Sequence, residues 1–189
     1  MHFNEIDNEK MLRKQISAVR PILKKHNKVF GIDRDYTGTQ LTMAHFCYSL
    51  RLDEIKSKIN FSKKRLCLRV MESDAKGQPI AIYESGVDEK MSKYFQVFLD
   101  KKCYNYLISG VEKLKKFEKI NKNGEIRYLR IAALNLEIVW LHYEDGEEDL
   151  FVLNQNFGEP QPVLTETQLL VLLNEMKYKL DKMDESMGG

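Results

Sequence analysis

The stretch LNLEIVWLHYEDGEEDLFVL, residues 134–153, decides the fold class. Apolar side chains recur at every second position in its first part, which is the period of a β-strand: Leu134, Leu136, Ile138 and Trp140. The acidic segment 144–149 follows, and its Asp145 and Gly146 favour a tight turn. The chain then returns through residues 150–153. The stretch therefore predicts an antiparallel hairpin whose first strand lies centrally in a sheet.

Strands are also predicted upstream of this hairpin. Residues 39–52 fit both a strand and a helix, and we favour a strand because aromatic and polar residues alternate there. Residues 65–72 and 79–84 are predicted to form a second hairpin around a turn that contains Gly77. Residues 28–33 are predicted as a short strand.

Helical periodicity precedes and separates these strands. The first predicted helix has an apolar stripe made of Leu12, Ile16, Val19 and Leu23. Pro21 lacks a backbone donor, so we expect a kink or a break near Arg20. Residues 88–114 have apolar residues at helical spacing and are predicted as one long helix, or as two helices separated at Gly110.

A third helix is predicted near the end of the chain. Thr165 and Gln168 form a capping box that opens it, and it extends over about residues 165–184. Its leucine and methionine stripe packs on the protein's own sheet or, as the alternative, docks on a partner. Hairpins with helices before, between and after them indicate the α+β class. We expect one α+β domain over residues 1–189, with a mainly antiparallel sheet of about five or six strands and N-terminal, central and C-terminal helices.

Composition limits the class of protein. The chain has 189 residues, of which 43% are hydrophobic and 31% charged, as in ordinary globular domains. Glu5, Asp7 and Glu9 interrupt the start of the chain where an export signal would be apolar, and no apolar run approaches the length of a membrane span. The three cysteines, Cys47, Cys67 and Cys103, are widely spaced, which fits thiols in a reducing compartment. We therefore expect a cytoplasmic protein that does not cross a membrane.

The net charge of +2 hides an asymmetry along the chain. Residues 1–130 contain 27 Lys and Arg against 16 Asp and Glu, a balance of +11. Residues 131–189 contain 3 against 12, a balance of −9. Such asymmetry favours an acidic or nucleic-acid partner for the basic part, or self-association, and its alternative is a set of solvated faces.

Two pairs of residues are weak candidates for catalysis. Asp33 and Asp35 lie at the end of a predicted strand, where two carboxylates could hold a metal or activate a water, and a solvated turn is the favoured alternative. His45 and Cys47 fall on one face of the predicted strand 39–52, the minimum for a thiolate activated by an imidazole. A half-buried structural pair is the favoured alternative for them.

Basic runs supply six candidate partner-binding residues: Lys63, Lys64, Arg65, Lys113, Lys115 and Lys116. Each run also contains an aromatic residue. The four histidines are not spaced as zinc ligands, and no nucleotide, dinucleotide, hydrolase or metalloprotease motif occurs. His142 follows Trp140 on one strand face and is either a pocket residue or a residue at the edge of the core.

These features favour a binding or interaction protein without catalysis, and with no cofactor or metal. A protein partner or self-association is the leading expectation for its partner. One alternative is a hydrolase-like enzyme with a site at Asp33 and Asp35 or at Cys47 and His45. The other is a nucleic-acid-associated protein that uses its lysine clusters.

Overall fold

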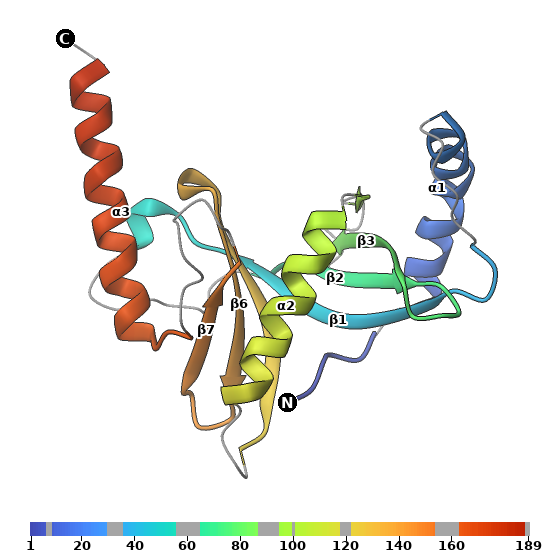
Figure 1. The fold of residues 1–189 in the computed structure, drawn as a ribbon, viewed down its shortest axis with the longest axis horizontal. Coiled ribbons are helices and arrows are strands. Elements are labelled where there is room, and N and C mark those ends of the chain that lie inside the picture. Colours follow the sequence, from blue (N-terminus) through green and yellow to red (C-terminus); the bar gives the residue numbers. More distant parts are fainter. Residues whose placement is uncertain are drawn as a thin grey trace. The chain divides into compact units, whose positions relative to one another are not determined.

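The computed structural model describes residues 1–6, 9–29, 36–55, 65–86, 95–99, 101–117, 122–153 and 163–187 (Figure 1). Its helices, strands and single-turn 3₁₀ helices (η) are, in chain order, α1 Glu9–Val29, β1 Gln40–Ser49, η1 Leu52–Glu54, β2 Arg65–Ser73, β3 Pro79–Gly86, β4 Phe95–Phe98, α2 Lys101–Phe117, β5 Gly124–Ile131, η2 Ala132–Leu134, β6 Leu136–Tyr143, β7 Glu148–Val152 and α3 Glu166–Met187. The predicted α+β class, with N-terminal, central and C-terminal helices, is confirmed. None of the helices in the described ranges combines the length and the apolar character needed to cross a membrane.

The strands form a mixed sheet that is mostly antiparallel. Its hydrogen-bonded order is β4-β3-β2-β1-β5-β6-β7, with β1 and β5 parallel. The predicted hairpins β2–β3 and β6–β7 are both present, and β6 pairs on its other edge with β5. Seven strands exceed the number predicted, and β1 rather than β6 occupies the middle of the order.

The chain divides into two compact units. We call Phe3–His45 with Cys67–Asn105 the N-terminal unit, and Met1–His2 with Phe46–Leu66 and Tyr106–Gly189 the C-terminal unit. The expectation of a single domain stays a prediction.

In the N-terminal unit, the apolar stripe of α1 packs against β1, β2 and β3. The buried residues of this core are Leu12, Ile16, Leu23, Ala44, Val70, Ile80, Ala81 and Tyr83. A kink or a break was predicted near Arg20, but the helix continues through Pro21 without a break. Because Leu12 and Ile16 before the proline and Leu23 after it are all buried, their packing offsets the hydrogen bond that Pro21 cannot make.

In the C-terminal unit, one face of β5, β6 and β7 packs against α3. Trp140 is completely buried there, and Leu169, Leu173 and Met176 of α3 share its cluster. The capping box is confirmed, since the Thr165 backbone N–H donates to Gln168 Oε1 at 2.8 Å and the Gln168 N–H donates to Thr165 Oγ1 at 3.4 Å. The leucine stripe of α3 thus packs mainly on the unit's own sheet.

The structure tests the local predictions for residues 39–52, 88–114 and 28–33. Residues 39–52 contain a strand, as favoured. The prediction of helix over 88–114 was wrong for residues 95–98, which form β4 and pair with β3. The spacing of Phe95 and Phe98 imitates a helical turn, whereas Phe95 and Val97, two residues apart, pack on the core. Lys28 belongs to α1 and not to a strand, and residues 30–33 lie outside the described ranges.

Candidate functional site

The predicted site residues are distributed over both units. Asp33, Asp35, Lys63 and Lys64 lie outside the described residues. His45 lies in the N-terminal unit, whereas Cys47, Arg65, Lys113, Lys115 and Lys116 lie in the C-terminal unit.

His45 and Cys47 are both buried on β1. The His45 ring donates through Nδ1 to the Met43 carbonyl oxygen at 2.6 Å. Burial, with a contribution from the Arg69 guanidinium, lowers the pKa of His45 to about 3, so the ring is neutral at physiological pH. A catalytic role for His45 and Cys47 stays a prediction.

Two of the predicted basic residues are in contact with aromatic rings. The Arg65 guanidinium lies 4.0 Å from the centroid of the Phe46 ring, and Lys113 Nζ lies 5.5 Å from that of Phe151. Lys115 and Lys116 are exposed in the last turn of α2, where positive charge complements the helix dipole. Each of these four residues therefore has a structural role, and their part in partner binding stays a prediction.

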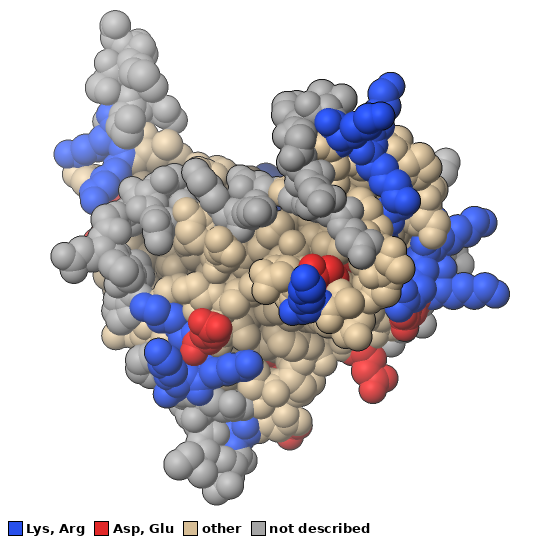
Figure 2. Space-filling model, turned by 45° about the vertical axis from the view of Figure 1, so that its right-hand side comes forward, with Lys and Arg blue, Asp and Glu red and all other residues tan. Residues whose placement is uncertain are grey.

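The most basic exposed feature of the N-terminal unit was not singled out from the sequence. It is the outer face of α1, opposite the apolar stripe, which we call the lysine face: Lys10, Lys14, Lys24, Lys25 and Lys28. Figure 2 shows Lys and Arg side chains gathered over α1 with few acidic side chains among them. These positions recur with the helical period, so the lysine face could have been predicted from the sequence in the same way as the apolar stripe.

The lysine face keeps its positive charge uncompensated within the described part of the chain. Glu9 is its one acidic neighbour on α1, and that carboxylate accepts from Arg13 Nε at 2.6 Å one helical turn away. No acidic partner of the five lysines occurs among the described residues. The face is therefore a concentrated positive surface about 27 Å long, since an α-helix rises 1.5 Å per residue.

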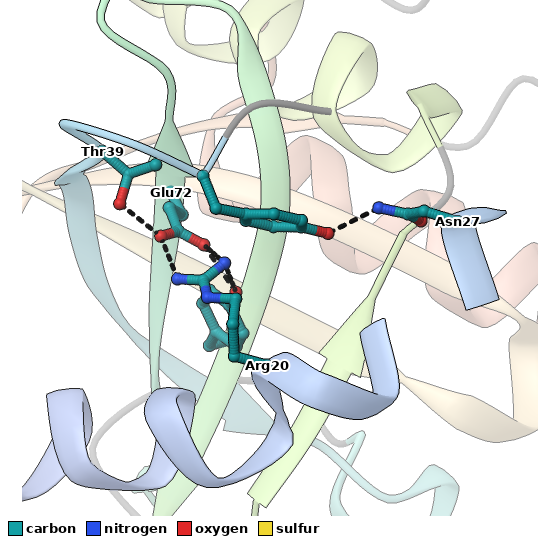
Figure 3. A network of polar contacts seen from close by, with 6 residues as sticks. Arg20, Asn27, Thr39 and Glu72 are labelled. Carbon is teal, nitrogen blue, oxygen red and sulfur yellow. Dashed lines mark hydrogen bonds and ion pairs between the residues drawn. The ribbon is translucent and has the colours of Figure 1, made fainter. Parts of the chain in front are cut away.

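A buried ion pair fixes how α1 sits on the sheet of its unit. Arg20 of α1 donates through Nη1 to Glu72 Oε2 at 2.9 Å and through Nη2 to Glu72 Oε1 at 2.5 Å, as Figure 3 shows. The Glu72 side chain, at the end of β2, is only 1% exposed. Bidentate pairing of this kind sets both the position and the rotation of the arginine.

Two hydroxyl groups complete the surroundings of Glu72. Thr39 Oγ1 donates to Oε1 at 2.6 Å, and Tyr83 Oη donates to Oε2 at 2.6 Å. Burial alone would raise the pKa of Glu72, but the hydrogen bonds from Arg20, Thr39 and Tyr83 outweigh it and lower the pKa. Since each carboxylate oxygen accepts two hydrogen bonds, no lone pair remains for a substrate. We call this arrangement the Glu72 clamp, and its role is structural.

The clamp extends toward the end of α1. The Tyr36 ring lies 4.2 Å from the Arg20 guanidinium, and its hydroxyl accepts a hydrogen bond from Asn27 Nδ2 at 2.6 Å. α1 is thereby held at two points in its second half as well as along its apolar stripe. The rotation that buries Leu12, Ile16 and Leu23 points the lysine face toward solvent.

The C-terminal unit contains a second polar arrangement. His142 of β6 and Glu148 of β7 are cross-strand partners, and His142 Nδ1 lies 2.7 Å from Glu148 Oε1. Burial raises the pKa of Glu148 to about 8, and burial together with the Arg127 charge lowers the pKa of His142. The pair therefore holds one proton at neutral pH, between the two side chains.

Neighbouring groups hold this pair in a partly desolvated environment. Glu148 is 7% exposed and His142 is 28% exposed. Arg127 donates to Glu125 Oε2 from Nε at 2.9 Å and from Nη2 at 2.6 Å, and its guanidinium lies 5.8 Å from the Trp140 ring centroid. The arrangement can hold and release a proton, whereas the sequence analysis predicted His142 only as a pocket residue or as a residue at the edge of the core.

No protein-family model, no curated protein and no solved structure matches this chain.

Proposed function

We propose that this protein is a binding protein that engages an acidic macromolecule through the lysine face of α1. The observation that carries the proposal is the set of five exposed lysines on one helical face without an acidic partner in the described ranges. The Glu72 clamp supports it, because a helix held rigidly presents its charges in a fixed arrangement.

The energetics of such a face suit association more than folding. Like charges at neighbouring positions of a helix destabilise it by a few tenths of a kcal/mol per pair, so the lysines are a cost to the isolated chain. A partner that brings negative charge relieves this repulsion and is attracted over about one Debye length, about 8 Å at physiological salt. Binding should therefore be fast and should weaken as salt is added.

The compartment is part of the proposal. Cys47 and Cys67 are buried and form no disulfide, which fits the reducing conditions of the cytoplasm. An acidic macromolecule in that compartment is the partner we propose.

Retention on immobilised heparin, a generic polyanion, tests the proposal. The test variant changes Lys10, Lys14, Lys24, Lys25 and Lys28 to Gln. The control variant changes five exposed or partly exposed lysines outside α1 to Gln: Lys76, Lys122, Lys177, Lys179 and Lys182. Both variants lose the same charge. We expect the test variant to elute at much lower salt than the control. Equal elution of the two variants would show that only net charge matters and would refute the proposal.

A further inference from the structure

We infer that the lysine face binds the phosphate backbone of duplex DNA, with α1 lying over a groove and without reading the base sequence. The inference rests on the proposed function and names the class of its partner. It follows from how the lysines are spaced, from what lies between them, and from which residue types the face lacks.

Four of the five lysines form two pairs along α1. Lys10 and Lys14 are one helical turn apart near its start, and Lys24 and Lys28 are one turn apart near its end. A helix rises 1.5 Å per residue, so about 15 Å separates Lys14 from Lys24 along the axis. The major groove of B-DNA is about 12 Å wide, so a helix laid over it would bring one pair to each flanking backbone.

Small residues occupy the lysine face between the two pairs. Ser17, Ala18 and Pro21 are exposed there. Their short side chains let the helix backbone come close to the mouth of a groove. They also offer few groups that could distinguish one base pair from another, which is why the inference is of sequence-independent binding.

The lysine face lacks the features that would be needed to bind other kinds of acidic partner. Among the α1 side chains that the structure describes, Ile22, 67% exposed, is the one large apolar residue that is exposed, since the apolar stripe is buried. Protein interfaces depend on buried aromatic or apolar anchors, and membrane-surface helices need a whole apolar face. α1 also contains no Phe, Tyr or Trp on which the bases of a single strand could stack. Lysine alone suffices for contacts to duplex phosphates.

The number of phosphates that the lysines neutralise predicts how binding depends on salt. Four neutralised phosphates predict a slope of about −3.6 for log K against log salt, and each contributes a factor of about 8 at 0.1 M salt. Replacing either pair with Gln should therefore weaken binding about 60-fold at 0.1 M salt and bring the slope to about −1.8.

The experiment measures fluorescence anisotropy of a labelled 20-base-pair duplex of random sequence, titrated with the full chain at several salt concentrations. K10Q/K14Q and K24Q/K28Q are the test variants, and K179Q/K182Q on α3 is the matched control. Thermal unfolding of every variant confirms that it is folded. We expect both test variants to lose affinity and slope as stated, with the control close to the parent protein.

Three further probes separate the inference from the proposed function: the single strand of the same sequence, heparin and poly-glutamate. Retention on heparin or binding to poly-glutamate, without binding to the duplex, would overturn the inference and leave the proposed function standing. Tighter binding to the single strand than to the duplex would also overturn the groove arrangement. A duplex affinity that the control variant lowers as much as the test variants would overturn the assignment to α1, and failure to bind any of the probes would overturn both.

Discussion

A rise in pH from 6.5 to 8 should destabilise the folded protein by about 1.3 kcal/mol through the His142–Glu148 pair. In the unfolded chain these groups titrate near their ordinary pKa values, about 4.5 for Glu148 and 6.5 for His142. In the folded protein the pair keeps one proton until the pH reaches about 8, the raised pKa of Glu148. Above pH 6.5 the folded state therefore binds one more proton than the unfolded state, and its stability falls as the pH rises.

The size of the effect follows from the width of this window. One proton costs 1.36 kcal/mol per pH unit, so a window of about 1.5 units corresponds to at most about 2 kcal/mol. Half of the unfolded His142 is still protonated at pH 6.5, and half of the folded pair has lost its proton at pH 8, so the change between these two pH values is about 1.3 kcal/mol. Between pH 4.5 and 6.5 both states bind one proton, since the unfolded histidine is charged there, and the pair contributes no slope. Below that window the lowered pKa of His142 reverses the slope. The stability contribution of the pair is thus largest between about pH 4.5 and 6.5.

Urea unfolding of the parent protein, E148Q and E112Q at pH 6.5 and pH 8 measures this contribution. Gln at position 148 cannot ionise and can donate to His142 Nδ1, so E148Q should show none of this loss of stability over the same interval. Glu112 is exposed on α2, and E112Q should follow the parent. A parent protein whose stability is the same at both pH values, or an E148Q variant with the parent's pH dependence, would refute the reasoning.

Two further predictions concern packing. Glu72→Gln removes the charge at the centre of the clamp and leaves a half-buried cation unpaired, so unfolding by urea should show a loss of about 3 kcal/mol, whereas Arg51→Gln, in an exposed pair, should change stability by under about 0.5 kcal/mol. Gly110→Ala should lower the free energy of unfolding by about 1–3 kcal/mol although alanine is the better helix former, because a Cβ there would lie 2.6 Å from Val139 Cγ1. The control Ser109→Ala lies outside this contact and should be neutral or slightly stabilising. A stabilised G110A variant would contradict the close packing of α2.

Local sequence rules predicted the parts of the fold in which one signal dominates. In β6 and β7, alternating apolar residues flank Asp145 and Gly146, and Gly146 has the positive φ of 83° that such a turn requires. The capping box at Thr165 depends on residues only three positions apart. These elements needed no information from the rest of the chain.

Other elements were missed because distant partners decide them. Residues 124–131 form β5. Ile126 and Tyr128 alternate there with Glu125 and Arg127, as in a strand with one polar face, but this signal is only four residues long, and pairing with β1 and β6 extends the strand to Ile131. β4 is only four residues long and depends on β3 in the same way.

The candidate site shows the same division. The lysine face follows from helical period alone and could have been predicted. The clamp could not, since Arg20 and Glu72 are 52 residues apart and no local pattern relates them. Glu148 belongs to an acidic segment that suggests a solvated turn, and its burial follows from its cross-strand position opposite His142.

Pro21 gives the lysine face a chemical feature besides its charge. Proline has no N–H, so the Ser17 carbonyl, one turn earlier on the same face, lacks its intrahelical donor. Midway between the two lysine pairs, a surface built of cationic donors therefore presents a hydrogen-bond acceptor. The phosphate backbone of a duplex carries no hydrogen-bond donor, so water would satisfy this acceptor in the complex. The acceptor therefore adds no preference for one base pair over another, and the complex stays free to move along the duplex.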